Sequence, residues 1–290
     1  MLPLMRLLAR CPLWLLHAAG VLLGWLSYAL SPSYRARMRE NAARAGLSAA
    51  DRRAAVGESG KLVTELPRLW LRPADVPLGD TVHWAGHERM AEWASSPRGL
   101  ILLTPHLGTF EICAQAYAEA FGAIRPLTVL YRPARKAWLR ELEETARARP
   151  FLATAPANLA GVRQMLKALR RGEAVGLLPD QVPPEGQGVW APFFGHPAYT
   201  MTLATRLARQ TGARMGLMWT ERQPGGAGWV VHVQDMPPGP WDEPAPEGDA
   251  GGLDALEAAA LNRAMEDVIR RCPTQYLWGY HRYKAPRSAA

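Results

Sequence analysis

The stretch 99–111 constrains the fold more than any other part of the chain. It opens with the apolar run Leu100–Leu103, whose length suits a buried strand, and the turn residues Pro105 and Gly108 then end that strand. A helix is predicted to follow near Phe110, with Thr109 as its N-cap. This order of strand, loop and helix is typical of an open α/β sheet, and it places the loop at the carboxyl edge, where ligands and catalytic residues gather.

The loop and the first helical turn carry the pair His106 and Glu111. On one continuous helix these side chains would lie about 140° apart, but a bend at Gly108 lets the carboxylate turn back onto the imidazole. A carboxylate on one ring nitrogen leaves the other free to accept a proton, which is the arrangement of a general base. The plainer interpretation is a loop histidine and a first-turn carboxylate favoured by the helix dipole.

Short apolar strands alternate with helices along the rest of the chain. Strands are predicted at 127–131, 174–178, 214–220 and 229–233, and helices at 33–70 with a stop at Gly46, 88–95, 137–149, 159–171, 200–210 and 254–271. The alternation predicts an α/β fold with a mainly parallel, mixed sheet flanked by helices. The segment 237–252, rich in Pro, Gly and acidic residues, is predicted to be a mobile loop.

The run Leu13–Leu30 is uncharged and predicts a membrane helix, because spanning a bilayer takes roughly 17–25 residues. A cleaved signal peptide is the alternative, since Arg6 and Arg10 precede the run. Arg35 and two further arginines follow it at once, and positive flanks stay on the cytoplasmic side. We therefore favour an uncleaved, single-pass anchor over residues 1–32 and a cytoplasmic domain over residues 33–290.

Composition limits the chemistry. The net charge of +8 suggests an anionic partner, and three cysteines without metal spacing predict neither a disulfide framework nor a metal site. The sequence contains no G-x-S-x-G, G-x-x-x-x-G-K, H-E-x-x-H or G-x-G-x-x-G motif, which disfavours a serine hydrolase, a nucleotide hydrolase, a zinc protease or a Rossmann dehydrogenase. What remains is a base without a nucleophile of its own, which could activate a substrate hydroxyl for attack on an acyl carbonyl.

Several motifs in a fixed order resemble the late (secondary) acyltransferases of lipid A biosynthesis, of the lauroyl and myristoyl type. They are His106-x-x-x-x-Glu111, Tyr131-Arg-Pro133, Pro179-Asp-Gln181, Pro192-Phe-Phe-Gly195 and the tail Gln275-Tyr-Leu-Trp278 with His281-Arg-Tyr-Lys284. The resemblance runs from the anchor to Lys284. The Phe-Pro-Glu-Gly-Thr-Arg element of the wider glycerolipid acyltransferases is missing, which makes a glycerol-phosphate acceptor less suitable.

The resemblance implies a glycerolipid-acyltransferase-like fold and the transfer of a fatty acyl chain from acyl carrier protein, without a cofactor. The acceptor would be a hydroxyl of a Kdo-bearing lipid A precursor, at the cytoplasmic face of the bacterial inner membrane. His106 would be the general base and Glu111 its orienting partner. Arg147, or its neighbour Arg149, would bind phosphate or stabilise the oxyanion, and Asp180 would hold an arginine or a substrate hydroxyl. The plainer interpretations are a solvated helix face for the arginines and a loop cap for Asp180.

A basic surface beside the membrane would suit both the acidic carrier protein and the phosphates of the precursor. Its candidates are Arg132, Arg135, Lys136, Arg163, Lys167, Arg170 and Arg171. An acyl pocket could be lined by Leu102, Phe110, Phe193, Phe194 and Trp278. Nucleic acid is not expected, because no recognition motif is present. The alternatives are acylation of another lipid acceptor, such as an ornithine lipid, a glycine lipid or a lysophospholipid, and a non-catalytic, membrane-anchored lipid-binding protein.

Overall fold

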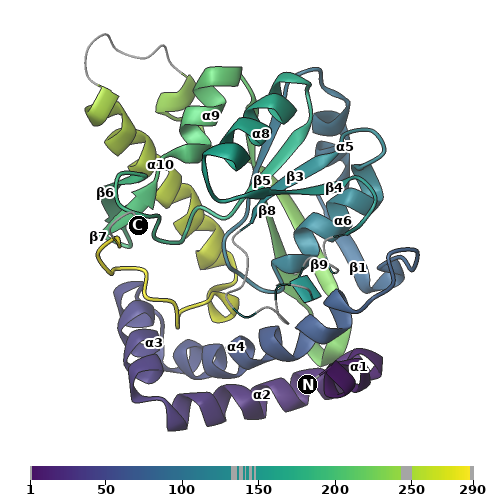
Figure 1. The fold of residues 1–290 in the computed structure, drawn as a ribbon. Coiled ribbons are helices and arrows are strands. Elements are labelled where there is room, and N and C mark those ends of the chain that lie inside the picture. Colours follow the sequence, from purple (N-terminus) through teal and green to yellow (C-terminus); the bar gives the residue numbers. More distant parts are fainter. Residues whose placement is uncertain are drawn as a thin grey trace.

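The computed structural model describes residues 2–131, 136, 140, 142, 143, 146, 148–242 and 250–287. At the centre of this part of the chain lies a seven-stranded sheet of order β1-β9-β8-β2-β5-β3-β4 (Figure 1). Its strands are β1 (Val82–Ala85), β2 (Leu100–Leu103), β3 (Leu127–Tyr131), β4 (Leu152–Pro156), β5 (Ala174–Leu177), β8 (Arg214–Arg222) and β9 (Trp229–Asp235). Only the β8–β9 pair is antiparallel among these strands. The mainly parallel, mixed sheet predicted from the sequence is therefore confirmed.

Strand β2 is at the middle of the sheet and all four of its residues are buried. It is apolar on both faces because helices cover both sides of a parallel sheet. Ile101 and Leu103 face one hydrophobic cluster, together with side chains of α8 (Leu159–Arg170), α9 (Leu203–Thr211) and α10 (Ala250–Arg271). Leu100 and Leu102 face a second cluster, formed with α5 (His87–Ser95) and α6 (Glu111–Phe121). The result is a three-layer α/β sandwich.

Four amino-terminal helices lie along the carboxyl edge of the sheet, at the bottom of Figure 1. They are α1 (Leu2–Arg10), α2 (Leu13–Leu30), α3 (Pro32–Arg44) and α4 (Ala49–Trp70). The chain between α3 and α4 passes through Gly46 with a φ of +74°, which agrees with the predicted stop. Helix α4 reaches the end of β8, where Arg222 forms ion pairs with Glu58 and Glu65 of α4.

Helix α2 packs along α4 at unusually short range. A Cβ atom on Gly60 would lie 1.9 Å from the Gly20 carbonyl oxygen, and one on Gly24 would lie 2.2 Å from the Val56 carbonyl oxygen. The two backbones approach this closely because the contact residues lack side chains. In the described part of the chain, α2 is the helix long and apolar enough to cross a membrane. The division of the chain at residue 32 stays a prediction.

The opposite face of α2 exposes large apolar side chains. They are Trp14, Leu15, Leu22, Trp25, Leu26 and Leu30. Contiguous exposed apolar surface of this kind is typical of membrane contact. Helix α2 therefore has one face suited to contact with a membrane and an opposite face that packs against α4.

Three predictions about local structure are wrong. Thr109 does not cap α6, because its hydroxyl donates to Glu65 instead and the N-cap position is taken by Phe110. The helix expected from residue 200 begins only at Leu203, since the residues before it form a hairpin of β6 (Gly188–Phe193) and β7 (His196–Met201). Of the loop expected over 237–252, residues 243–249 lie outside the described residues, and the last three positions belong to α10, which begins at Ala250.

Candidate active site

His106 and Asp180 meet at the carboxyl edge of the sheet. They follow β2 and β5, which are adjacent and parallel with Leu103 opposite Leu177. The His106 Nδ1 atom lies 2.7 Å from Asp180 Oδ1, and the His106 backbone N–H donates to Asp180 Oδ2 over 2.9 Å. One carboxylate thus holds both the ring and the backbone of the histidine.

These contacts set the tautomer of the imidazole. Because an ionised carboxylate is only an acceptor, Nδ1 of His106 must be the donor to Asp180. A neutral ring then has its lone pair on Nε2, which lies 2.8 Å from the amide nitrogen of Gln181 and accepts a hydrogen bond from it. A substrate hydroxyl placed where Gln181 now donates would deliver its proton to this lone pair.

Asp180 stays ionised although it is buried. Burial by itself raises the pKa of this carboxyl, but the neighbouring His106 and its two hydrogen bonds bring the pKa below its ordinary value. The Tyr276 hydroxyl also contacts Asp180, and the pKa of Tyr276 is raised well above its ordinary value by burial. Arg282, itself buried, adds positive charge near Asp180. The site is therefore built to keep a negative charge beside the imidazole.

The loop that carries His106 is fixed by the carboxyl-terminal tail. Leu107 forms an isolated bridge with Tyr276, and the Gly108 N–H donates to the Gln275 carbonyl over 3.0 Å. Gly108 has a φ of +56°, and a Cβ atom there would lie 1.9 Å from the Thr220 carbonyl oxygen. A glycine is required at this position for both reasons. The bend inferred from the sequence at Gly108 is thus present.

Glu111 is the first residue of α6. The sequence predicts that it orients His106, whereas the structure gives the Nδ1 atom of the ring to Asp180. The role of Glu111 as an orienting partner stays a prediction. Glu111 is close to His106 in the sequence, which is why the sequence favours it as the partner of the ring. Asp180 is distant in the sequence and reaches the ring only because β2 pairs with β5.

The predicted substrate-binding arginines are only partly described. Arg132 and Arg147 lie outside the described residues. Arg149 is buried, and its guanidinium donates to the backbone carbonyls of Leu69, Arg72 and Ala146. Burial, with the charge of Arg72, lowers the pKa of Arg149 to about 10. These contacts join Arg149 to the end of α4, and its binding role stays a prediction.

The apolar residues proposed for an acyl pocket lie in three places. Phe110 contacts His106 with a ring separation of 4.7 Å. Leu102 is in the core that faces α6. Phe193, Phe194 and Trp278 belong to the core on the other face of the sheet. Of this set, Phe110 is the residue whose ring contacts the candidate base.

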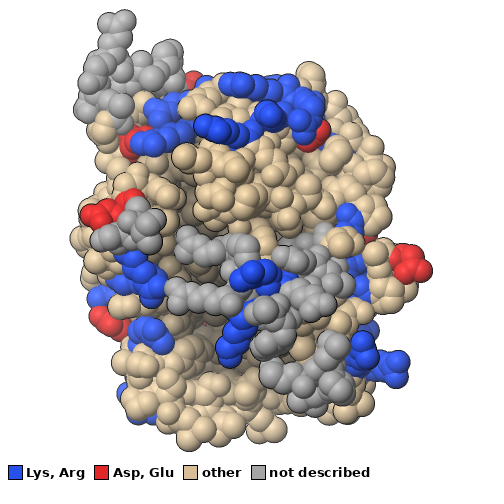
Figure 2. All heavy atoms as spheres, viewed as in Figure 1, with Lys and Arg blue, Asp and Glu red and all other residues tan. Residues whose placement is uncertain are grey.

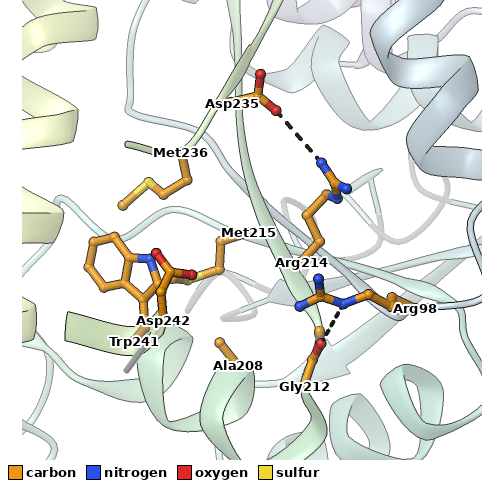
Figure 3. Close-up of a pocket in the computed structure, with 10 residues that line it drawn as sticks. Arg98, Ala208, Gly212, Arg214, Met215, Asp235, Met236, Trp241 and Asp242 are labelled. Carbon is orange, nitrogen blue, oxygen red and sulfur yellow. Dashed lines mark hydrogen bonds and ion pairs between the residues drawn. The ribbon is translucent and has the colours of Figure 1, made fainter. Parts of the chain in front are cut away.

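A cavity of about 270 Å³ lies at the opposite edge of the sheet (Figure 3). It is lined by Arg98 before β2, by the end of α9 and the start of β8, by the end of β9 and by the short segment Pro240–Asp242. In Figure 3, Trp241 and Met236 lie on one side of it and Arg98 and Arg214 on the other. The parallel strands β2 and β8 separate this cavity from His106, so it is not the site of the candidate base.

Two of the basic residues proposed for a surface beside the membrane helix lie away from that helix. Helix α8 starts after β4, at the carboxyl edge, and ends before β5, at the amino edge. Arg170 and Arg171 therefore lie at the edge remote from α2. Figure 2 shows one group of Lys and Arg side chains at the top of the view, far from α2 at the bottom of Figure 1, and further ones across the middle and lower part of the view. The number of basic residues in a sequence does not reveal at which edge of the sheet a helix ends, so their position relative to α2 could not be predicted.

The arrangement suits general-base chemistry on a hydroxyl. The ionised Asp180 accepts a hydrogen bond from Nδ1 of His106, and the lone pair on Nε2 is left to accept a proton. The His106 side chain is 13% exposed, so a substrate can reach it. Gln181 and Tyr276 were not predicted as neighbours of the base, although both lie in the motifs Pro179-Asp-Gln181 and Gln275–Trp278. These two motifs are brought to one place by β5 and by the tail after α10.

Comparison with known proteins gives a consistent result. The sequence model of a family described as bacterial lipid A biosynthesis acyltransferase matches residues 2–285. The chain is similar to the lipid A biosynthesis lauroyltransferase of Escherichia coli (strain K12), with 30% identity over 202 residues, which is 69% of this chain and 60% of that protein. It is also similar to the palmitoleoyltransferase of the same strain, with 28% identity over 189 residues, 64% of this chain and 56% of that protein. The matched region thus spans less than two thirds of these relatives.

Proposed function

Since the chain belongs to the bacterial lipid A biosynthesis acyltransferase family, we propose that it transfers a fatty acyl chain to a hydroxyl of a lipid A precursor. The observation that carries the proposal is the buried, ionised Asp180 on Nδ1 of His106, which leaves Nε2 to act as a base. The match over residues 2–285 supports the same reaction class. The donor in this proposal is an acyl carrier protein thioester, and the acceptor is a precursor bearing Kdo.

The proposed step is a direct acyl transfer. The acceptor hydroxyl gives its proton to His106 Nε2 while its oxygen bonds to the thioester carbonyl carbon. The carbon–sulfur bond then breaks, the thiol leaves with a proton from the imidazolium, and an ester remains. Asp180 stabilises the imidazolium between these two proton transfers, through its charge and its hydrogen bond to Nδ1.

The oxyanion and the substrate phosphates are stabilised by hydrogen-bond donors that carry positive charge. Arg147 is the candidate for the oxyanion or a phosphate, with Arg149 as its alternative, and Arg132 is the candidate for the precursor's phosphates. Glu111 assists in orienting His106. These assignments follow from the family motifs, and substitution of each residue can be scored in the assay described below.

The proposed location is the cytoplasmic face of the bacterial inner membrane. Helix α2 holds the protein there with its exposed apolar side chains, such as Trp14, Leu22 and Trp25. The carboxyl edge of the sheet faces α4 and α2, which brings a lipid hydroxyl and His106 to the same side of the molecule (Figure 1). The single-pass crossing by α2 stays a prediction.

The test is the mass of the lipid product. The purified full-length chain in detergent is given lauroyl, myristoyl and palmitoyl groups, each as acyl carrier protein and as coenzyme A thioesters. The acceptors are Kdo2-lipid IVA, lipid IVA without Kdo, an ornithine lipid and a lysophospholipid. A parallel preparation from cells without the gene is the control.

We expect one acyl chain to be added to Kdo2-lipid IVA from the carrier protein thioesters. Acylation of the ornithine lipid or the lysophospholipid alone would replace the proposed acceptor. Equal rates with coenzyme A thioesters would overturn the proposed donor. No transfer from any donor by folded protein would favour a binding role.

A further inference from the structure

We propose that Glu65, Arg222 and His17 form a positioning cluster behind the catalytic loop, so that the docking of α2 on α4 fixes the geometry of the base. The proposal rests on the proposed function for its effect on turnover. Its structural part concerns the loop between His106 and Glu111 and is independent of the substrate.

The cluster is centred on a fully buried carboxylate. Glu65 on α4 receives two hydrogen bonds from Arg222 at the end of β8, over 2.7 Å from Nε and 3.0 Å from Nη2. Both residues are buried. Buried charges of this kind are stable only when they are paired and fully hydrogen-bonded, and removal of one partner leaves the other uncompensated. Glu65 therefore needs every donor that surrounds it.

One of those donors is in the catalytic loop. The Thr109 hydroxyl donates to Glu65 Oε2 over 2.5 Å and accepts from the indole N–H of Trp229 over 2.9 Å. It also accepts from Arg222 Nη2 over 3.3 Å. The single proton and both lone pairs of the hydroxyl are thus used. Thr109 lies between His106 and Glu111, so its position fixes the middle of the segment that carries the candidate catalytic pair.

Another donor comes from α2. His17 Nε2 lies 2.6 Å from Glu65 Oε1, and the ring is buried between α2 and α4. The Thr64 hydroxyl, on the next residue of α4, donates to the Leu16 carbonyl over 2.7 Å. A purely hydrophobic membrane helix needs no such polar contacts with the catalytic domain. The bond to Glu65 connects α2, through a single carboxylate, to Thr109.

The charges of the cluster balance without help from His17. Arg222 also pairs with Glu58 over 2.7 Å, and Glu58 pairs with Lys61. Two carboxylates thus face two cations. Burial by itself raises the pKa of Glu65, but Arg222 and the hydrogen bonds from His17 and Thr109 lower it to about 2. Glu65 is therefore ionised, and His17 adds a hydrogen bond that requires no charge.

The cluster supplies the third of three restraints on the loop. Asp180 holds His106, and the tail holds Leu107 and Gly108. Glu65 holds Thr109, and this is the restraint that connects the loop to α2. Loss of the His17 bond leaves one buried oxygen of Glu65 with fewer donors, which favours a shift of the carboxylate and of Thr109 with it.

The test compares three variants of the full-length chain in detergent. His17→Ala removes the bond to Glu65, and His17→Gln keeps an N–H donor near the position of Nε2. Ser27→Ala is the matched control, because Ser27 is exposed on the same helix and lies outside both the cluster and the apolar face. Amide hydrogen exchange is measured by mass spectrometry for the loop peptide 104–112 and for peptides of β5 and α8. The values of kcat and KM are measured in the acyl-transfer assay.

We expect His17→Ala to speed exchange in the loop peptide by about tenfold while the β5 and α8 peptides are unchanged. The same variant should lower kcat by about tenfold with little change in KM, because a small displacement of the base affects the reaction more than binding. His17→Gln should restore most of the original loop protection and most of the original kcat, and Ser27→Ala should match the unmodified chain in both.

Unchanged loop exchange in folded His17→Ala would overturn the proposal. So would an equal rise in the loop, β5 and α8 peptides, which would indicate general destabilisation. Failure of His17→Gln to restore loop exchange would exclude the hydrogen bond as the cause. If the unmodified chain transfers no acyl group, the proposed function fails, and the exchange data alone then decide on the cluster.

Discussion

His106 is held through its backbone and through both ring nitrogens. Its backbone N–H and Nδ1 contact Asp180, and Nε2 contacts the amide of Gln181. A carboxylate that fixes both the ring and the backbone of a base limits the rotation of the imidazole and fixes its tautomer. At the scale of the residue, Asp180 is therefore the side chain on which the tautomer and orientation of the base depend.

The variant Asp180→Asn should lower kcat by about 10²–10⁴-fold, because the neutral amide neither stabilises the imidazolium nor fixes the tautomer. The effect on KM should be small, since the side chain is buried behind the ring. Initial rates of acyl transfer, with circular dichroism as a check on folding, would measure this. Glu111→Gln is the matched comparison, since it makes the same change at the carboxylate that the sequence favours. A folded Asp180→Asn variant with more than half of the original kcat would contradict the assignment.

The elements were predicted unequally well, for physical reasons. Strands β2, β3 and β5 are short apolar runs bounded by turn residues, and their positions followed from the sequence to within a residue. Strand β4, with the sequence Leu-Ala-Thr-Ala-Pro, lies at the edge of the sheet and is only partly buried, so it carries no strong apolar signal. The β6–β7 hairpin was missed because Phe194 and Gly195, both at positive φ, make a turn inside an otherwise apolar motif.

The contact between α2 and α4 can be tested through its glycines. Gly60→Ala should lower the melting temperature, because the added Cβ would lie 1.9 Å from the Gly20 carbonyl oxygen and 2.5 Å from the Gly24 nitrogen. Overpacking of this kind costs about 1–3 kcal/mol, more than the roughly 1 kcal/mol that alanine gains over glycine in a helix. Thermal unfolding in detergent is the measurement.

The control for this variant is on the same helix. At Gly57 the added Cβ would meet only the side chain of Val21, at 3.3 Å, which can move. Gly57→Ala should therefore leave the melting temperature unchanged or raise it. A melting temperature for Gly60→Ala equal to that of Gly57→Ala would show that α2 is not packed on α4 as the structure has it.

At the scale of the whole molecule, the site is assembled from distant parts of the chain. His106 and Asp180 are 74 residues apart, and Glu65 and Arg222 are 157 residues apart. Strand order brings them together, and a single sequence does not reveal strand order. One signal for the cluster was available, because Glu65 lies on the apolar stripe of α4 formed by Leu62, Leu66 and Leu69. A carboxylate on such a stripe needs a buried partner.

The two edges of the sheet have different character. The carboxyl edge carries His106, Asp180 and the cluster under α4, next to the apolar face of α2. The amino edge carries the end of α8 with Arg170 and Arg171, and the cavity lined by Trp241. The candidate base and the membrane-compatible helix thus lie at the same edge of the sheet. The assignment of His106 as the base is the claim on which the proposed reaction depends.

The rate of acyl transfer by His106→Ala tests this claim most directly. The product lipid is measured by mass spectrometry at matched protein concentrations, with the melting temperature as the check on folding. We predict a loss of about 10²–10⁴-fold in kcat, since the hydroxyl then has no base, and a melting temperature close to that of the unmodified chain. A folded His106→Ala variant that transfers acyl groups within twofold of the original rate would contradict the account.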